Sequence, residues 1–198
     1  MSPTPARTSR DAITAAARAI LEEDGLDAVS MQAVANRVGV RPPSLYKHVT
    51  DRTALIRGVS AAVTADLADA LRVPTASGDP GDDLRQMARR YRAFVRANPA
   101  GYALLFTPPG SGLLPDESAL AALGEPIVAV TARLVGEADA LGAARTFVAW
   151  AHGFTSLELA GGFRLGGDVE AAYERGIDLI LAGLSGPATP QSASRRRG

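Results

Sequence analysis

Apolar residues recur every three to four positions through most of this chain, which is the spacing of a helix with one buried face. Stretches with that spacing begin near Ile13, Ser30, Leu84 and Pro99, and others cover residues 43–49, 51–71, 117–138, 140–161 and 168–184. No stretch shows the convincing two-residue alternation of a half-buried strand. The chain is therefore predicted to be all-α.

One interruption of the helical pattern points to a particular unit. Residues 36–52 read NRVGVRPPSLYKHVTDR, with a glycine and two prolines between two short apolar segments. Gly39 can take the positive φ of a tight turn, and Pro43 suits the first turn of a helix, where no N–H is needed. Ala35, four residues before Gly39, lets the next helix cross closely. This spacing is that of a helix-turn-helix, whose second helix enters the major groove of DNA.

The second helix of this unit begins with groups that bind nucleic acid. An apolar surface, hydroxyls, a positive charge and an imidazole come from Pro43, Ser44, Tyr46, Lys47 and His48. The net charge of the whole chain is zero, but residues 37–57 contain five bases and one acid, a local charge of +4. A compact basic block indicates an anionic partner, although charge alone favours a solvated helix face.

Composition changes in two places and so predicts the domain limits. Residues 73–82, VPTASGDPGD, have the proline, glycine and serine content of a linker. The predicted domains are therefore residues 1–72, which include the long linking helix, and residues 82–185. Residues 186–198 are predicted to be a disordered tail.

The remaining composition excludes several classes of protein. Apolar residues make up 46% of the chain, as in a soluble globular protein, and no apolar run approaches the ~18 residues that span a bilayer. No secretion signal is recognisable, so a cytoplasmic protein without membrane contact is expected. The absence of cysteine excludes thiol catalysis and cysteine-ligated zinc. No nucleophile has a base nearby in sequence, and the glycines of GGFRLGGD follow no strand. We expect no enzyme, no cofactor and no metal site.

The first 60 or so residues resemble the DNA-binding head of the TetR family of transcriptional regulators. The stretch that carries the resemblance is AARAILEEDGLDAVSMQAVANRVGVRPPSLYKHVTDRTALI. It contains a glycine loop, a serine that starts the second helix, a Gly-Val turn and a Leu-Tyr pair. The resemblance implies double-stranded DNA contacts of two kinds. Phosphates would be held by Ser30, Tyr46, His48 and Arg52, and the groove floor would be faced by Arg41, Pro43, Ser44 and Lys47.

Three positions depart from the usual pattern of this head. Arg41 stands where a capping serine or threonine is common, so the third helix is expected to lack a side-chain cap. Val49 replaces an aromatic residue beneath the recognition helix, and Thr53 replaces an acid at the start of the fourth helix. These differences leave the fold intact but prevent any transfer of base preference.

The second half of the chain is similar to a C-terminal domain of one TetR subgroup, marked by a Trp-x-His-Gly segment. Trp150, His152 and Gly153 match that marker. The resemblance implies a helical cavity for a small, mostly apolar effector. The aromatic residues of this half are candidates for its walls, although packing into the core explains them equally well. The predicted ligand-binding residues are Tyr91, Phe94, Tyr102, Phe106, Trp150, Phe154 and Glu158. We expect His152 to be a hydrogen-bonded structural residue, with contact to the ligand as the alternative.

The resemblance also implies a homodimer built from the last two helices. The final helix carries a continuous apolar stripe, predicted to be the dimer seam, of Tyr173, Ile177, Ile180, Leu181 and Leu184. Packing within one chain is the alternative. The fifth helix carries Arg85, Arg89, Arg92 and Arg96 beside its apolar stripe. A solvated face is expected there, with an acidic effector or nearby DNA as alternatives.

Two functions remain open from the sequence. The favoured one is a dimeric regulator, a repressor released from a palindromic operator by its effector. The alternative is a helical ligand-binding or interaction protein whose head is vestigial and does not bind DNA. The intact Gly39 turn and the Tyr46–His48 run argue for the first.

Overall fold

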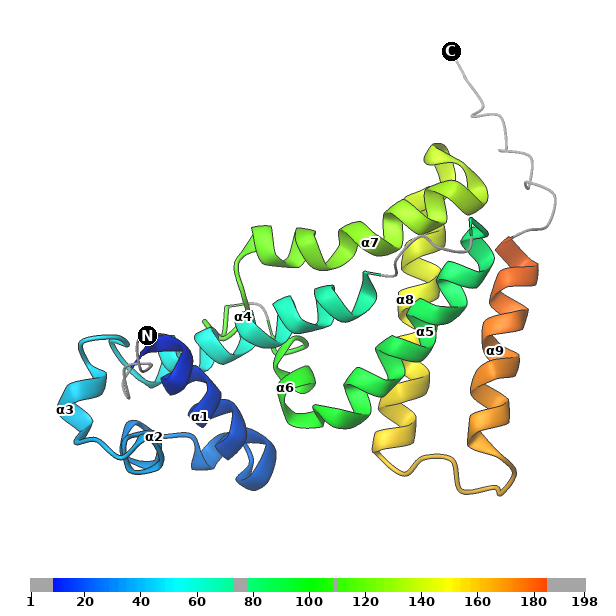
Figure 1. Cartoon of the computed structure of the whole chain (residues 1–198). Helices are drawn as coiled ribbons and strands as arrows, with labels where there is room; N and C mark the ends of the chain where they lie inside the picture. Colours follow the sequence, from blue (N-terminus) through cyan, green and yellow to red (C-terminus); the bar gives the residue numbers. More distant parts are fainter. Residues whose placement is uncertain (1–8, 73–77, 109, 185–198) are drawn as a thin grey trace, which may run out of the picture.

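The computed structural model describes residues 9–72, 78–108 and 110–184, and these residues form helices and connecting turns without a strand (Figure 1). In chain order the elements are α1 (Arg10–Asp24), the 3-10 turn η1 (Leu26–Ala28), α2 (Met31–Val38), α3 (Pro42–Leu45), α4 (Arg52–Leu71), α5 (Pro80–Ala97), α6 (Pro99–Leu104), α7 (Glu117–Val135), α8 (Glu137–Leu159) and α9 (Val169–Leu184). The predicted all-α class is confirmed. The predicted tail at 186–198 and residues 73–77 of the predicted linker lie outside the described residues.

Side-chain caps start the helices of the head where the sequence predicts them. The Ser30 hydroxyl accepts a hydrogen bond of 3.1 Å from the Ala33 N–H at the start of α2. The Asp51 carboxylate accepts one of 2.7 Å from the Ala54 N–H at the start of α4. Each cap satisfies an N–H that has no partner within the helix, which is why the chain turns into a helix at these points.

Several boundaries differ from the prediction. Helix α3 begins at Pro42 and ends at Leu45, and the chain continues as a turn in which the Val49 N–H still reaches the Leu45 carbonyl at 2.9 Å. Helix α8 begins at Glu137, directly after Gly136 ends α7 with a φ of 87°. Helix α5 begins at Pro80, so the predicted domain start at residue 82 falls inside a helix.

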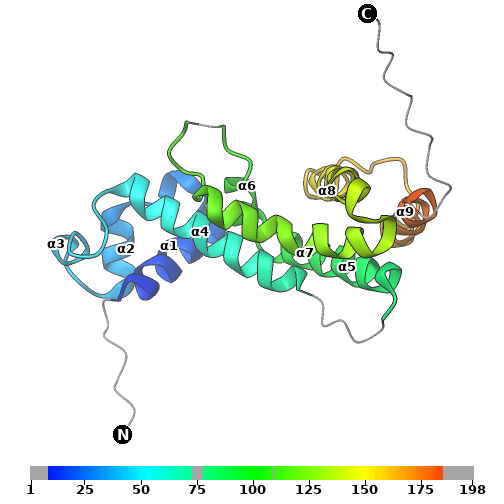
Figure 2. The same cartoon turned by 90° about the horizontal axis from the view of Figure 1, so that it is seen from above.

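Two hydrophobic cores lie at the two ends of an elongated molecule (Figure 2). The core of the head contains Leu55 and Val63 from the first part of α4, whereas Leu67 and Leu71 from the end of α4 belong to the other core. Helix α6 also crosses the division, because Leu104 packs into the core of the head. The division between the two parts therefore runs through α4 rather than along the sequence after residue 72.

Helix α7 lies along α4 and packs against α8 (Figures 1 and 2). Its mean hydropathy is 1.4 over 18 residues, of which 17% are buried. Length and composition alone would let such a helix cross a bilayer, contrary to the expectation that no segment approaches that length. The contacts of α7 with α4, α5 and α8 are those of a helix in a bundle.

Candidate nucleic-acid and effector sites

The turn between α2 and α3 is closed by backbone hydrogen bonds that need a left-handed residue. Gly39 has φ 80° and ψ 35°, and its N–H bonds to the carbonyls of Ala35 and Asn36. The Val40 N–H also reaches the Ala35 carbonyl, at 2.9 Å. A glycine meets this conformation without the penalty of a Cβ atom. The turn therefore sets the direction in which α3 leaves α2.

One face of α3 and the turn after it packs into the core of the head, and the residues on the other face are exposed to solvent. Leu45 and Val49 are buried in the core of the head, while Tyr46 is 55% exposed, and Lys47 and His48 are also exposed. The predicted helix residues Tyr46 and Lys47 thus lie in the turn after α3, at the outer end of the molecule (Figure 2). A phenol, an ammonium group and an imidazole meet solvent there together.

The other residues predicted to contact the floor of the DNA groove differ in how far they are exposed to solvent. Arg41 and Pro43 are exposed and Ser44 is half-buried. Arg41 is the residue before α3 and makes no side-chain cap, as its type predicts. Its guanidinium is therefore not used by the helix that it precedes.

Two predicted phosphate contacts have structural partners. The Ser30 hydroxyl oxygen accepts the capping hydrogen bond of α2. Ser30 is only half-buried, so its hydroxyl proton can still reach a phosphate. The Arg52 guanidinium donates to the Val29 carbonyl at 2.6 Å and to the Leu26 carbonyl at 2.7 Å. Arg52 thus holds the η1 turn against α4. The sequence predicted a phosphate contact for Arg52 but not this structural role.

The basic block of residues 37–57 is divided between structural and exposed cations. Arg37 binds Glu23 through two hydrogen bonds of 2.6 and 2.7 Å, and Arg57 donates to the Gly112 carbonyl at 2.9 Å. The Arg37 hydrogen bonds hold the pKa of Glu23 below its usual value. With Arg52 also engaged, the cations at the recognition end are Arg41 and Lys47. The excess of positive charge is therefore concentrated where α3 faces outward.

A chain of hydrogen bonds runs through the second core from α5 to α8. The hydroxyls of Tyr91 and Tyr102 are hydrogen-bonded to each other, and the Tyr102 hydroxyl lies 2.6 Å from Nδ1 of His152. Both tyrosines are buried, and burial raises the pKa of each hydroxyl. His152 is therefore hydrogen-bonded, as expected for a lone histidine, and its partner is one of the tyrosines with a buried polar tip.

Several of the aromatic side chains predicted to wall a cavity under α5 are packed against one another. Trp150 stacks on Tyr173 with ring centres 5.1 Å apart, and Phe154 packs edge-on against the same ring at 5.0 Å. A methyl group at Gly176 would overlap the Trp150 ring, so this glycine lets α9 lie directly against it. Phe94 is half-buried and contacts both cores. These aromatic residues join helices to one another.

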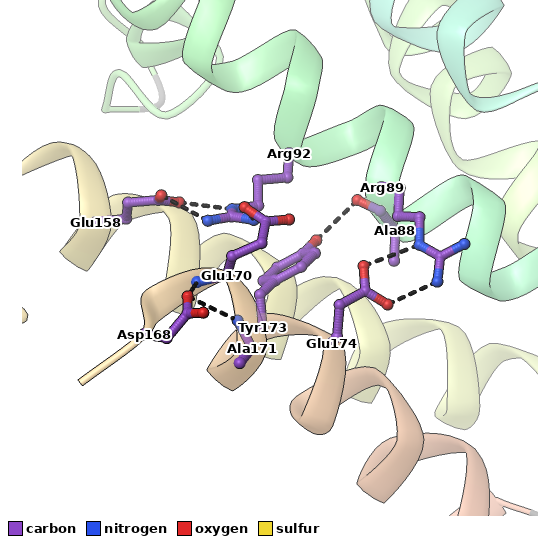
Figure 3. Close-up of polar contacts among 9 residues, drawn as sticks. All are labelled: Ala88, Arg89, Arg92, Glu158, Asp168, Glu170, Ala171, Tyr173 and Glu174. Atoms are coloured by element: carbon purple, nitrogen blue, oxygen red, sulfur yellow. Dashed lines mark hydrogen bonds and ion pairs between the residues drawn. The ribbon is translucent and has the colours of Figure 1, made fainter.

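Glu158, the acid predicted for the ligand site, is bound to an arginine (Figure 3). Arg92 donates to both Glu158 oxygens at 2.8 Å and to Glu170 at 2.6 Å, and it lies over the Tyr173 ring at 4.7 Å. The Tyr173 hydroxyl donates to the Ala88 carbonyl at 2.8 Å. Hydrogen bonds from Arg92 hold the pKa of Glu158 below its usual value. Glu158 therefore joins α8 to α5 and α9.

The arginines of α5 form a ladder with α9, which corrects the expectation of a solvated face. Arg89 binds Glu174 through two bonds of 2.9 and 2.7 Å, and Arg85 reaches Asp178 at 3.0 Å (Figure 3 shows the first pair). The acids recur on α9 at a spacing of four residues, and the arginines that pair with them recur on α5 at spacings of four and three, so each row follows one face of its helix. This complementarity could have been noticed in the sequence.

The predicted dimer seam is largely an internal surface. Tyr173, Ile177 and Leu181 are buried within the single chain and belong to the second core, while Ile180 and Leu184 are half-buried. The apolar stripe of α9 packs on α5 and α8 within the chain. Side chains already covered by their own chain cannot meet a second one, so the prediction is wrong for these three residues.

A groove lies between α7 and α8 in the C-terminal part. It measures about 360 Å³, and of the predicted ligand-binding residues Phe106 lines it, together with His152. The His152 ring stacks on Phe106 with ring centres 3.9 Å apart. A larger hollow, of about 670 Å³, lies between α1 and α4 in the head and is lined by small and charged residues.

One contact that the sequence did not reveal joins the two parts of the molecule. The Glu22 carboxylate, near the end of α1, accepts hydrogen bonds from the N–H groups of Ala100 and Gly101, at 3.0 and 2.8 Å. These N–H groups begin α6. A methyl group at Gly101 would lie 2.9 Å from both Glu22 and Val63, so the helices approach closely here. No local pattern announces this contact, since the two residues are 79 positions apart.

Two family profiles match this chain. Residues 13–59 match the bacterial regulatory proteins of the tetR family, and residues 84–180 match a tetracyclin repressor-like C-terminal domain. An uncharacterised HTH-type transcriptional regulator of Mycobacterium tuberculosis is 32% identical over 160 residues, which cover 79% of this chain and 73% of the relative.

Solved structures share the fold over most of the chain. A protein of unknown function from Rhodococcus sp. RHA1 has a TM-score of 0.77 and 25% identity and covers 94% of this chain and 100% of its own. The structure of BioQ with its double-stranded DNA operator has a TM-score of 0.66 and 22% identity, and covers 90% of this chain and 98% of its own. At that identity the second likeness concerns the fold alone.

Arg92→Ala should destabilise the protein far more than Arg89→Ala. The side chains of Arg92 and Glu158 are 6% and 18% exposed, so removing Arg92 leaves a poorly solvated carboxylate, at a cost of about 2–3 kcal/mol. Arg89 and Glu174 are 56% and 35% exposed, and their pair should contribute less than about 1 kcal/mol. Urea unfolding of both variants at neutral pH would measure the difference. Equal losses would contradict it.

The Arg92 contribution should also depend on pH. Because the folded-state pKa of Glu158 lies below its ordinary 4.5, the stabilisation is fully present above that value and is lost as the pH falls through the folded-state pKa. The gap in stability between the parent and Arg92→Ala should therefore narrow below about pH 4.5.

Proposed function

We propose, on the premise that this chain belongs to the TetR family of bacterial transcriptional regulators, that it is a homodimeric repressor of a palindromic operator. A small, mostly apolar effector bound in the C-terminal part releases it from DNA. The protein acts in the cytoplasm, where its operator is. The head is a DNA-binding helix-turn-helix.

The exposed turn at the end of α3 is the observation that supports DNA binding. Tyr46, Lys47 and His48 stand outward on a base formed by buried Leu45 and Val49. A helix-turn-helix reads the major groove with the start of its second helix and binds phosphates with the groups beside it. A head that no longer bound DNA would not need to keep an ammonium group, a phenol and an imidazole exposed together.

The second protomer is proposed to pack on the outer face of α8 and α9. Within one chain, Leu157 and Leu179 are large exposed apolar side chains on these helices. An added methyl group at Gly142, Gly153 or Gly183 would meet no atom, so this face is smooth enough for another helix to approach closely. It lies at the opposite end from α3, which would leave both heads of a dimer free to reach DNA (Figure 2). Two heads would meet half-sites about 34–36 Å apart or a multiple of this.

Effector and operator are proposed to oppose each other through α6. Helix α6 carries Tyr102 on the effector side, and its first N–H groups bind Glu22 of α1 on the head side. A shift of α6 would therefore move α1 directly and α4 through Val63. Such coupling is reciprocal, so operator DNA would weaken effector binding by the same factor.

Lys47→Ala and Tyr46→Ala should weaken operator binding without unfolding the protein. If Lys47 makes one charged contact with DNA in each head, its loss should lower the slope of log K against log salt by about two for a dimer. Titration of the DNA upstream of the gene at several salt concentrations would measure this, with exposed Arg96→Ala on α5 as control. Binding that equals the parent in both variants would favour the alternative of a vestigial head.

Leu179→Glu should give folded monomers, because Leu179 is 58% exposed in one chain and a buried unpaired charge costs several kcal/mol in a dimer seam. Ile177→Glu, two residues away, should instead unfold the protein, since Ile177 is fully buried within its own chain. Light scattering and circular dichroism would separate the two results. A Leu179→Glu protein that remains dimeric would place the interface on another face.

Glu22→Ala should reduce the effect of effector on operator binding more than it changes operator binding itself. A coupling factor in the general range of about 5–150 fold should fall several-fold, because the contact between α1 and α6 is lost. The measurement is operator affinity with and without an effector found by screening for release. Glu23→Ala is the matched control, since Glu23 is the next residue of α1 and faces Arg37 on the surface. Unchanged coupling in Glu22→Ala would exclude this route.

A further inference from the structure

The groove between α7 and α8 has walls that are almost entirely apolar. Ile127 and Val128 of α7 face Leu141 and Val148 of α8 across it. Its volume of about 360 Å³ lies within the range of small-molecule sites, which are lined by apolar groups and a few polar ones that set orientation. The polar side chains that line it are His152 and Arg145.

His152 is held in one orientation by two contacts on different sides of its ring. Nδ1 lies 2.6 Å from the Tyr102 hydroxyl, and the ring face stacks on Phe106. Burial lowers the pKa of His152, so the imidazole is neutral at neutral pH. A neutral imidazole has one donor nitrogen and one acceptor nitrogen, and Nδ1 is already occupied by Tyr102. Nε2 is therefore the ring nitrogen that can meet a molecule in the groove.

The direction of the hydrogen-bond chain determines what Nε2 offers. If Tyr91 donates to Tyr102 and Tyr102 donates to Nδ1, both hydroxyl protons are used within the bonds that the structure contains. The opposite direction would replace a phenol that donates to a basic ring nitrogen by the weaker pair of an imidazole N–H that donates to a phenol oxygen, and the Tyr91 proton would turn to its other side-chain partner, Thr155. The first direction makes Nδ1 the acceptor and leaves the proton on Nε2.

We propose that this groove is the effector site and that it takes an apolar molecule with a hydrogen-bond acceptor, such as a ketone, an ester or a carboxylate, which the Nε2–H of His152 recognises. This inference rests on the proposed effector response and names its ligand class. Arg145, exposed at the groove, adds a preference for a carboxylate over a neutral acceptor. Tyr102 is a positioning residue, since it sets the tautomer of His152.

The site is placed to act on the head. Tyr102 lies in α6, three residues from the start of the helix, where Glu22 binds the N–H groups of Ala100 and Gly101. A ligand that displaces the His152 ring would therefore act on α6 through one hydrogen bond, between His152 and Tyr102. No rearrangement of the larger core is needed to reach α1.

Three compounds of ten carbons test the ligand class: butyrophenone, 4-phenylbutyrate and butylbenzene, which lacks an acceptor. Binding to the full chain without DNA is measured by calorimetry. Butyrophenone should bind about five-fold more tightly than butylbenzene, the value of one net hydrogen bond. His152→Phe keeps an aromatic ring against Phe106 and should bring this ratio to about one. Arg145→Ala, the matched control, should weaken 4-phenylbutyrate only.

The tautomer is measured separately on the unaltered protein. The chain has two histidines, so long-range ¹H–¹⁵N spectra of histidine-labelled protein give one signal set for His152 and another for His48, an exposed internal reference. His152 should carry its proton on Nε2, and butyrophenone should shift that nitrogen while leaving His48 unchanged. Tyr102→Phe should populate the other tautomer and reduce the preference for butyrophenone. This measurement remains decisive if His152→Phe does not fold.

Two calorimetric results would overturn the proposal: equal binding of butylbenzene and butyrophenone, or no binding of any compound because a second protomer covers the groove. Two spectroscopic results would also overturn it: a proton on Nδ1 of His152 in the free protein, or a resonance of Nε2 that does not shift when butyrophenone is bound. All are measured without DNA. A failure of operator binding would therefore refute the proposed function without changing these results.

Discussion

Helix α4 belongs to both hydrophobic cores, and the other contacts between the two parts follow from this constraint. Its first part packs through Leu55 and Val63 in the core of the head, and its last turns pack through Leu67 and Leu71 in the other. A helix is stiff over this length, so neither core can shift along α4 without breaking apolar contacts of its own. Glu22 and Gly101, where α1 meets α6, add a second close connection between the two parts.

The far end of the molecule is organised by charge as much as by apolar packing. Helix α9 presents one apolar stripe to the second core, and beside it the acids Glu170, Glu174 and Asp178 meet the arginines of α5. Exposed pairs of this kind add little stability, but their matched spacing permits one register of α9 on α5. The buried Arg92 is different, because it also binds Glu158 of α8 and so ties three helices together. The apolar stripe of α9 is used within the chain, and Leu179 stays exposed on the opposite face of this helix.

Local chemistry explains why the head could be predicted in detail. Ser30 and Asp51 cap helices through their own neighbours, and Gly39 turns the chain through its own φ angle. Such features need only a few consecutive residues, so they are legible before any tertiary contact is known. The end of α3 was harder to predict, since four residues form the helix and the next turn continues only through the His48 and Val49 N–H groups, which both bond to the Leu45 carbonyl. The sequence nevertheless identified the residues that are exposed there, Tyr46, Lys47 and His48.

By itself, the sequence determined the helices, their caps, the helix-turn-helix and the family to which the chain belongs. It could not determine which apolar surface meets which, because a stripe such as Tyr173, Ile177 and Leu181 is equally suited to its own core and to a second chain. Nor could it assign partners to charged and polar groups distant in sequence, such as Glu158 with Arg92 or Glu22 with α6. Those pairings depend on how α5, α8 and α9 come together in three dimensions. The tertiary structure alone showed that aromatic rings under α5 are packed together and that a groove lies between α7 and α8, because the volume left between helices depends on their separation and not on the pattern along any one of them.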